Sequence, residues 1–118
     1  MNSLLRSFKY AFRGIFTGLA SGRNQKIHAL AAFFAISAAL YCGLSGTEYC
    51  VLALTISAVF SAELFNSAIE ELCDEICKGE RRPSIERIKD MSAAAVLVTA
   101  IASLFVAFFL FVAPLLKK

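Results

Sequence analysis

The sequence predicts an all-α membrane protein: an amino-terminal amphipathic helix at the membrane interface, then three transmembrane helices. Hydrophobic residues make up 58% of the chain, whereas a soluble domain contains roughly 45–50%. Charged residues are only 18% and leave long uncharged runs, and about 20 apolar residues are enough for a helix to cross a membrane. A soluble bundle of buried helices is the alternative, but so short a chain has too little polar sequence to cover three such helices. The 118 residues are expected to form one domain, residues 1–118.

The first element, residues 1–28, is predicted to be the interfacial helix. Apolar side chains recur from Leu5 to Leu19 at i, i+3 and i+4 spacing, and three basic residues lie away from the densest part of that stripe. Gly14, Gly18 and Gly22 recur every fourth residue. Each glycine costs about 1 kcal/mol in a helix, so we expect another backbone or a ligand to lie against this smooth face.

Three apolar segments follow, and they are the predicted transmembrane helices: residues 29–47, 49–69 and 91–113. Only the middle segment contains a charged residue, Glu63. The turn GLSGTE separates the first two segments and is too short to hold an external domain.

Residues 70–90 are the predicted connection between the second and third transmembrane helices. The stretch KGERRPS should break the chain at Gly79 and Pro83, and Ser84 is the predicted N-cap of the helix that follows. Pro114 is predicted to end that helix.

The basic residues predict the orientation of the chain in its membrane. Of the 12 Lys and Arg residues, five lie in residues 1–28 and five in residues 70–90. The positive-inside rule therefore makes the amino terminus and the 70–90 loop cytoplasmic. With a net charge of only +3, this surface is expected to meet anionic lipid headgroups, and no nucleic-acid partner is predicted.

A polar stripe crosses the second transmembrane segment. On a helix each residue advances about 100°, which places Glu63, Asn66, Glu70 and Asp74 on one narrow face running from the membrane to the cytoplasm. An ionised carboxylate in hydrocarbon costs about 2.5–3.5 kcal/mol or more, so Glu63 should face the bundle interior. There it could be a general base at the lipid–water boundary, or it could simply fix packing by bonding Asn66 or another helix.

Nearby residues could bind a metal and phosphate groups. Glu70 could ligate Mg²⁺, which prefers one or two carboxylates plus phosphate oxygens. Lys89 could bind a phosphate as a point charge, and Asp90 could hold Lys89 or a nucleotide hydroxyl, with an interfacial salt bridge as the alternative. No G-x-x-x-x-G-K-[ST] loop is present, which excludes a P-loop nucleotide site. His28, at the start of the first segment, is interpreted as an interfacial anchor.

Two stretches, ELFNSAIEELCDE and KDMSAAAV, resemble the prokaryotic diacylglycerol kinase family, which includes undecaprenol kinases. The family pattern is E-x-x-N-[ST]-A-[IL]-E-x-x-x-D, followed by K-D and small residues. The residues that match it are Glu63, Asn66, Ser67, Ala68, Ile69, Glu70, Asp74, Lys89 and Asp90. YAFRG and RNQKIH also resemble the family, so the similarity covers essentially the whole chain.

The resemblance implies a homotrimer with composite sites that transfers the γ-phosphoryl group of MgATP to a lipid hydroxyl, on diacylglycerol or undecaprenol. It implies that Glu63 is the base that activates this hydroxyl. It also implies a set of residues around the metal and nucleotide: Glu70 as Mg²⁺ ligand, Asn66 in support of it, Lys89 and Asp90 at the nucleotide, and Tyr10 on its adenine side.

One position departs from the family. Where the family usually has a Glu that is a second metal ligand, this chain has Gly22, and residues 1–28 contain no acid. Only Asp74 could move in to support the metal. We therefore expect a working kinase that needs more Mg²⁺; the alternatives are an impaired relative acting as a membrane binding or regulatory subunit, and a small transporter using Glu63 as a proton site.

Overall fold

The computed structural model describes residues 2–117, apart from the side chain of Arg23, and within them the chain is helical without a strand. Three helices are long and apolar enough to cross a membrane, which confirms the predicted fold class. The elements in chain order are α1 (Ser3–Ala20), α2 (Arg23–Cys42), α3 (Gly46–Cys77), α4 (Pro83–Ala107), the π-helix η1 (Phe108–Val112) and α5 (Ala113–Leu116).

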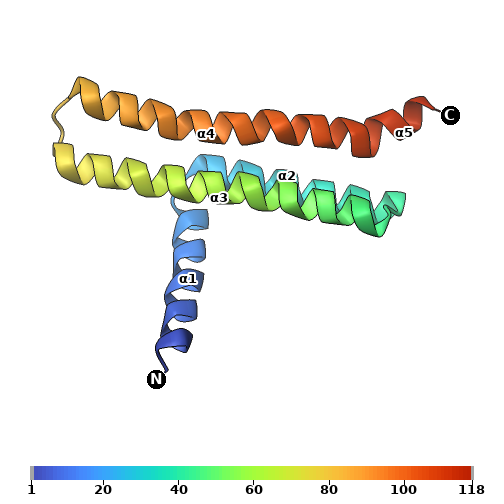
Figure 1. Ribbon diagram of the computed structural model, residues 1–118, viewed down its shortest axis with the longest axis horizontal. Coiled ribbons are helices and arrows are strands. Elements are labelled where there is room, and N and C mark those ends of the chain that lie inside the picture. Colours follow the sequence, from blue (N-terminus) through green and yellow to red (C-terminus); the bar gives the residue numbers. More distant parts are fainter. Residues whose placement is uncertain (1, 118) are drawn as a thin grey trace.

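The three long helices run side by side, and α1 projects away across their direction (Figure 1). α3 and α4 form an antiparallel pair that extends beyond the start of α2. Near the turn between α2 and α3, a small buried cluster of Ala39, Leu52 and Leu110 joins α2, α3 and η1. Elsewhere large apolar side chains are exposed, for example Phe33 at 64% and Leu54 at 71%, as a surface facing lipid requires.

The turn between α2 and α3 is closed by local hydrogen bonds. α2 ends at Cys42 and is capped by Gly43, whose φ of 68° is left-handed and therefore favours glycine. α3 begins with a capping box, in which the Glu48 amide donates to the Ser45 hydroxyl at 3.2 Å and the Ser45 amide donates to the Glu48 carboxylate at 3.0 Å. The Tyr49 hydroxyl also donates to the Ala39 carbonyl at 3.1 Å. This turn thus fixes how α3 returns along α2.

The connection between α3 and α4 corrects one sequence prediction. α4 begins at Pro83, with Arg82 as its N-cap, so the prediction of Ser84 as the N-cap is wrong. Proline is favoured at the first helical position because its missing N–H would have no partner there. The turn itself contains two residues with positive φ, Lys78 and Gly79.

The carboxyl-terminal end corrects another prediction. Pro114 does not end the helix, because it lies inside α5, which follows directly on η1. Within η1 the helix widens, and the Ala113 amide donates to the Phe108 carbonyl five residues back. A proline cannot donate to the residue four positions earlier and clashes with its carbonyl, and a π turn is a way to continue the helix past it.

The amino-terminal segment is divided by a bend. α1 ends at Ala20, and α2 begins at Arg23 after the two residues Ser21 and Gly22. α1 is held against α3 at Gly18, where an added Cβ would overlap the Leu64 side chain. A side chain, and not a second backbone, therefore occupies the space that this glycine leaves.

Candidate functional site

A polar cavity of about 200 Å³ lies where the bend between α1 and α2 meets α3. Three residues of the predicted stripe, Glu63, Asn66 and Glu70, line it from α3. The complete lining is Ser21, Gly22, Asn24, Gln25, Glu63, Asn66, Ser67 and Glu70. The stripe therefore runs from the buried Glu63 to the exposed Glu70 and Asp74, and we call the space lined by its first three residues the polar cavity.

Glu63 is the most enclosed member of the stripe. Its residue exposure is 1%, and its Oε1 atom lies 2.9 Å from Nε2 of His28 on α2. This is an ion-pair distance when the imidazole is protonated, yet no donor among the described residues reaches Oε1 in hydrogen-bond geometry. The interpretation of His28 as an interfacial anchor is therefore wrong: the residue lies against Glu63 inside the fold.

Two further side chains connect the helices around the cavity. The Gln25 amide on α2, only 3% exposed, donates to the Ser67 hydroxyl on α3. The Ser92 hydroxyl on α4 donates to Oδ1 of Asn66 at 2.8 Å. Because its amide oxygen is already engaged, Asn66 can offer mainly its N–H₂ group to a ligand. Gln25 is a residue of the site that no sequence pattern indicated, although it lies in the family-like stretch RNQKIH.

A second, larger cavity of about 630 Å³ lies between α1 and the part of α3 that extends beyond α2. It shares Ser21, Ser67 and Glu70 with the polar cavity. Tyr10 lines it from α1, which brings Tyr10 and Glu70 to one space although they are far apart in the sequence. We call this the α1–α3 cavity.

Lys89 and Asp90 are not brought to these two cavities. Nζ of Lys89 lies 2.7 Å from Oδ1 of Asp74, and Asp90 is exposed on α4. The salt bridge that was the alternative for Lys89 is thus present, with Asp74 as its partner in place of Asp90. Asp74 also lines the α1–α3 cavity, so it lies between the cavity and Lys89.

The metal-binding potential of the site rests on oxygen donors. Glu63 and Glu70 supply carboxylate oxygens to one cavity, and carboxylates are a ligand type that Mg²⁺ accepts. The described residues contain no group of three or more His, Cys, Asp or Glu side chains that could hold a metal by themselves. These donors fit Mg²⁺ only if a bound phosphate and water complete its coordination.

Gly22 lines the same cavity as Glu70. The position that the family usually fills with a Glu is therefore beside the candidate metal ligand. A Cβ added at Gly22 would lie 3.0 Å from Oε1 of Gln25, the far end of a flexible side chain. A larger residue could be accepted there if Gln25 moved by a few tenths of an ångström.

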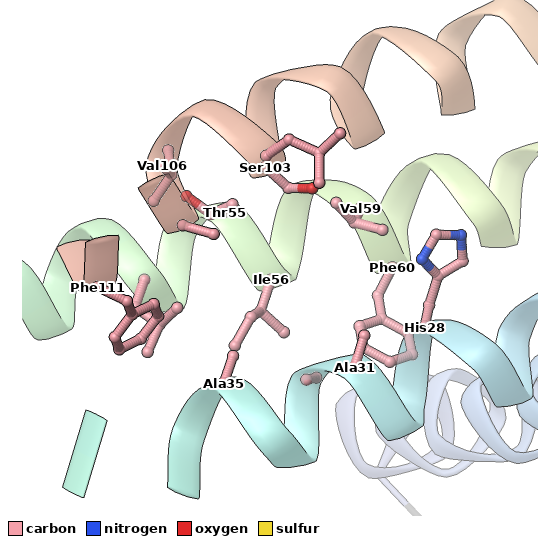
Figure 2. Close-up of a pocket in the computed structure, with 14 residues that line it drawn as sticks. His28, Ala31, Ala35, Thr55, Ile56, Val59, Phe60, Ser103, Val106 and Phe111 are labelled. Carbon is pink, nitrogen blue, oxygen red and sulfur yellow. The ribbon is translucent and has the colours of Figure 1, made fainter. Parts of the chain in front are cut away.

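An apolar groove of about 200 Å³ runs between α2, α3, α4 and η1. His28 and Phe60 lie near one end of it and Phe111 lies near the other (Figure 2). Its walls include the small residues Ala31 and Ala35 of α2. Because His28 lines the groove and also contacts Glu63, the groove ends beside the buried carboxylate of the polar cavity.

A family model described as prokaryotic diacylglycerol kinase matches residues 9–111 of the chain. The protein belongs to the prokaryotic diacylglycerol kinase family. This confirms the predicted family and, with it, the predicted class of enzyme, a lipid kinase of the bacterial membrane.

Two relatives extend the comparison over almost the whole chain. The chain is 38% identical over 116 residues to the diacylglycerol kinase of Synechocystis sp., covering 98% of this chain and 66% of that protein. It is 36% identical over 119 residues to the undecaprenol kinase of Bacillus subtilis, covering 98% and 93% respectively. It thus spans slightly less than two thirds of the first relative, and the two names specify different lipids.

Proposed function

We propose that this protein transfers the γ-phosphoryl group of ATP to a hydroxyl of a membrane lipid, diacylglycerol or undecaprenol, with Mg²⁺ as cofactor. The observation that carries the proposal is the position of Glu63. Its buried carboxylate lies where the end of an apolar groove meets a polar cavity. Phosphorylation of a lipid hydroxyl needs such a junction. The lipid chain is apolar, whereas ATP, which donates the phosphoryl group, is highly charged.

The acceptor lipid binds with part of its chain in the apolar groove and its hydroxyl beside Glu63. Glu63 is the base that takes the hydroxyl proton, a role that requires hydrogen-bond reach between carboxylate and hydroxyl. The burial of Glu63 supports this role. A carboxylate inside a membrane costs free energy, and such residues usually mark functional sites.

The nucleotide binds from the α1–α3 cavity, which is large and lies outside the apolar part of the fold. Glu70, supported by Asn66, would hold Mg²⁺ there together with ATP phosphates. The metal would neutralise charge on the phosphates, the main requirement of phosphoryl transfer. Tyr10 lies on the adenine side of this site, as its presence with Glu70 in one cavity supports.

Lys89 and Asp90 complete the nucleotide site from a neighbouring copy of the chain. In one chain Lys89 is turned to Asp74 and Asp90 is exposed, and neither residue lines the cavity that Tyr10 lines. A homotrimer with composite sites, which the family resemblance implies, would bring both residues to the cavity of the next copy. In this arrangement Asp74 supports Lys89 and is not itself a metal ligand.

The chain is oriented with its amino terminus and the 70–90 connection in the cytoplasm, in a bacterial plasma membrane. Residues 1–118 form a single domain. Within it, residues 1–28 lie at the membrane interface and lead to the first span. Exposed apolar side chains on α1, such as Phe12 and Phe16, support this placement. The spans lie within the membrane-compatible helices Asn24–Cys42, Gly46–Cys77 and Pro83–Leu116, and residues 29–47, 49–69 and 91–113 are the apolar segments predicted for them.

A catalytically impaired family member that binds lipid or nucleotide is the second candidate. Gly22 favours it, because the polar cavity lacks an acid there beside Glu70. Such a protein would bind MgATP without phosphorylating either lipid.

The test is transfer of labelled γ-phosphate from MgATP to diacylglycerol and to undecaprenol, by purified protein in micelles. Glu63→Gln should reduce transfer by about 10²-fold or more, the usual contribution of a general base. Glu75→Gln is the matched control, since Glu75 is an exposed residue of the same helix, and it should retain transfer. Full transfer by Glu63→Gln would refute the role of Glu63. Absence of transfer at every Mg²⁺ concentration would favour the impaired relative.

A further inference from the structure

His28 contacts the proposed base directly and has no role in the function proposed so far. It is the single histidine of the chain and lies on α2, whereas Glu63 lies on α3. Nε2 of His28 is 2.9 Å from Oε1 of Glu63, and the side chains are 23% and 2% exposed. The imidazole is therefore partly open to the apolar groove that it lines, while the carboxylate is almost completely enclosed.

The surroundings leave Glu63 with no other basic partner among the described residues of the polar cavity. From α2, Gln25 is committed to Ser67. From α3, Glu70 is the other ionisable side chain in the lining, and it has the same sign of charge. The end of α1 contributes Ser21, and the hydrogen bond from α4 reaches Asn66 and not Glu63.

We propose that His28 is a positioning residue for Glu63: its imidazole compensates the buried carboxylate and fixes the direction of that carboxylate at the end of the lipid groove. The inference rests on the proposed function. A charged side chain inside a membrane protein is normally paired, and His28 is the basic residue that lies against Glu63. With Oε1 facing the imidazole, Oε2 is the oxygen available to the lipid hydroxyl.

The reaction then proceeds as follows. The O–H bond of the lipid hydroxyl breaks, and its proton passes to Oε2 of Glu63. The hydroxyl oxygen forms a bond to the γ-phosphorus of ATP, while the bond from that phosphorus to the β,γ-bridging oxygen breaks and ADP leaves with the electron pair. His28 forms and breaks no covalent bond in this step. It keeps the carboxylate paired and pointed before the proton arrives.

The kinetic test compares His28→Gln with the parent protein. Glutamine can place an amide N–H near Oε1 but carries no charge, so it separates charge compensation from simple space filling. We expect kcat to fall by about 10- to 100-fold, the size of effect that misplacement of a reacting group produces. The KM for MgATP should not change, and the pH profile of kcat should change its shape. Tyr41→Phe, at an exposed position in the last turn of α2, is the control and should leave kcat unchanged.

A second measurement tests the pairing without using activity. In protein labelled with ¹⁵N-histidine and purified without a histidine tag, the imidazole signals can come only from His28. Glu63→Gln should shift these signals, whereas Glu70→Gln should leave them in place.

The outcomes distinguish the two proposals. The role of His28 would be overturned if His28→Gln had the kcat and pH profile of the parent. It would also be overturned if Glu63→Gln left the imidazole signals unshifted. In both cases the proposed lipid kinase activity would stand. If the parent protein phosphorylates neither lipid, the proposed function fails, and the imidazole signals still decide whether His28 and Glu63 are paired. A fall in kcat together with a shifted imidazole signal supports the inference.

Discussion

The carboxylates at the two ends of the polar stripe on α3 have similar distances to their basic partners but differ in their exposure to solvent. Glu63 lies 2.9 Å from His28, and Asp74 lies 2.7 Å from Lys89. The Glu63 side chain is 2% exposed, however, and the Asp74 side chain is 70% exposed. The contact distance therefore does not tell which pair contributes more to stability. Burial decides, because loss of a partner leaves a buried charge uncompensated but lets an exposed charge return to water.

The largest effect is expected when His28, the partner of the buried carboxylate, is removed. His28→Leu should lower the free energy of unfolding by about 3–5 kcal/mol, as expected when one member of a buried pair is lost. The measurement is unfolding by SDS in mixed micelles. The double variant His28→Leu/Glu63→Leu should recover most of the loss, since no charge remains to be compensated. If the single variant is as stable as the parent, the two ends do not differ as proposed.

A smaller effect is expected from adding an acid next to the buried end. Gly22→Glu would place a second carboxylate on the cavity that holds Glu70 and supply another oxygen ligand for Mg²⁺. The Mg²⁺ concentration that gives half-maximal lipid phosphorylation should fall several-fold. Gly22→Gln is the matched control, as it adds similar bulk without charge. An unchanged Mg²⁺ requirement in Gly22→Glu would show that the glycine does not limit metal binding.

The smallest effect is expected at the exposed end. Asp74→Asn should change the free energy of unfolding by less than about 1 kcal/mol, because exposed salt bridges contribute little. Lys89→Gln should change the free energy of unfolding by a similarly small amount. It should strongly reduce phosphorylation, however, if Lys89 contacts the nucleotide. Equal activity of Lys89→Gln and the parent would remove Lys89 from the proposed site, and a large loss of stability in either variant would contradict the comparison.

The sequence was sufficient for the features that depend on one helix at a time. The apolar runs predicted three membrane-compatible helices, and the spacing of Glu63, Asn66 and Glu70 predicted one shared face. It was not sufficient for features that depend on how separate helices meet. The contact of His28 with Glu63 requires the rotation of α2 against α3, which the periodicity of neither helix contains.

The local errors have similar causes. Ser84 is a good N-cap residue, but the neighbouring proline fits the first helical position better and moves the start of α4. Pro114 normally stops a helix, but a π turn ahead of it lets the chain continue.

The unbroken length of α3 has a consequence for how the protein tolerates different membranes. Glu63 and Glu70 lie on this one helix, so at about 1.5 Å rise per residue their levels differ by about 10 Å. A thicker or thinner bilayer can shift or tilt the helix, but both carboxylates move together. Their separation along the helix axis is thereby built into the backbone, so the proposed base and the proposed metal ligand stay equally far apart whatever the lipid composition around them.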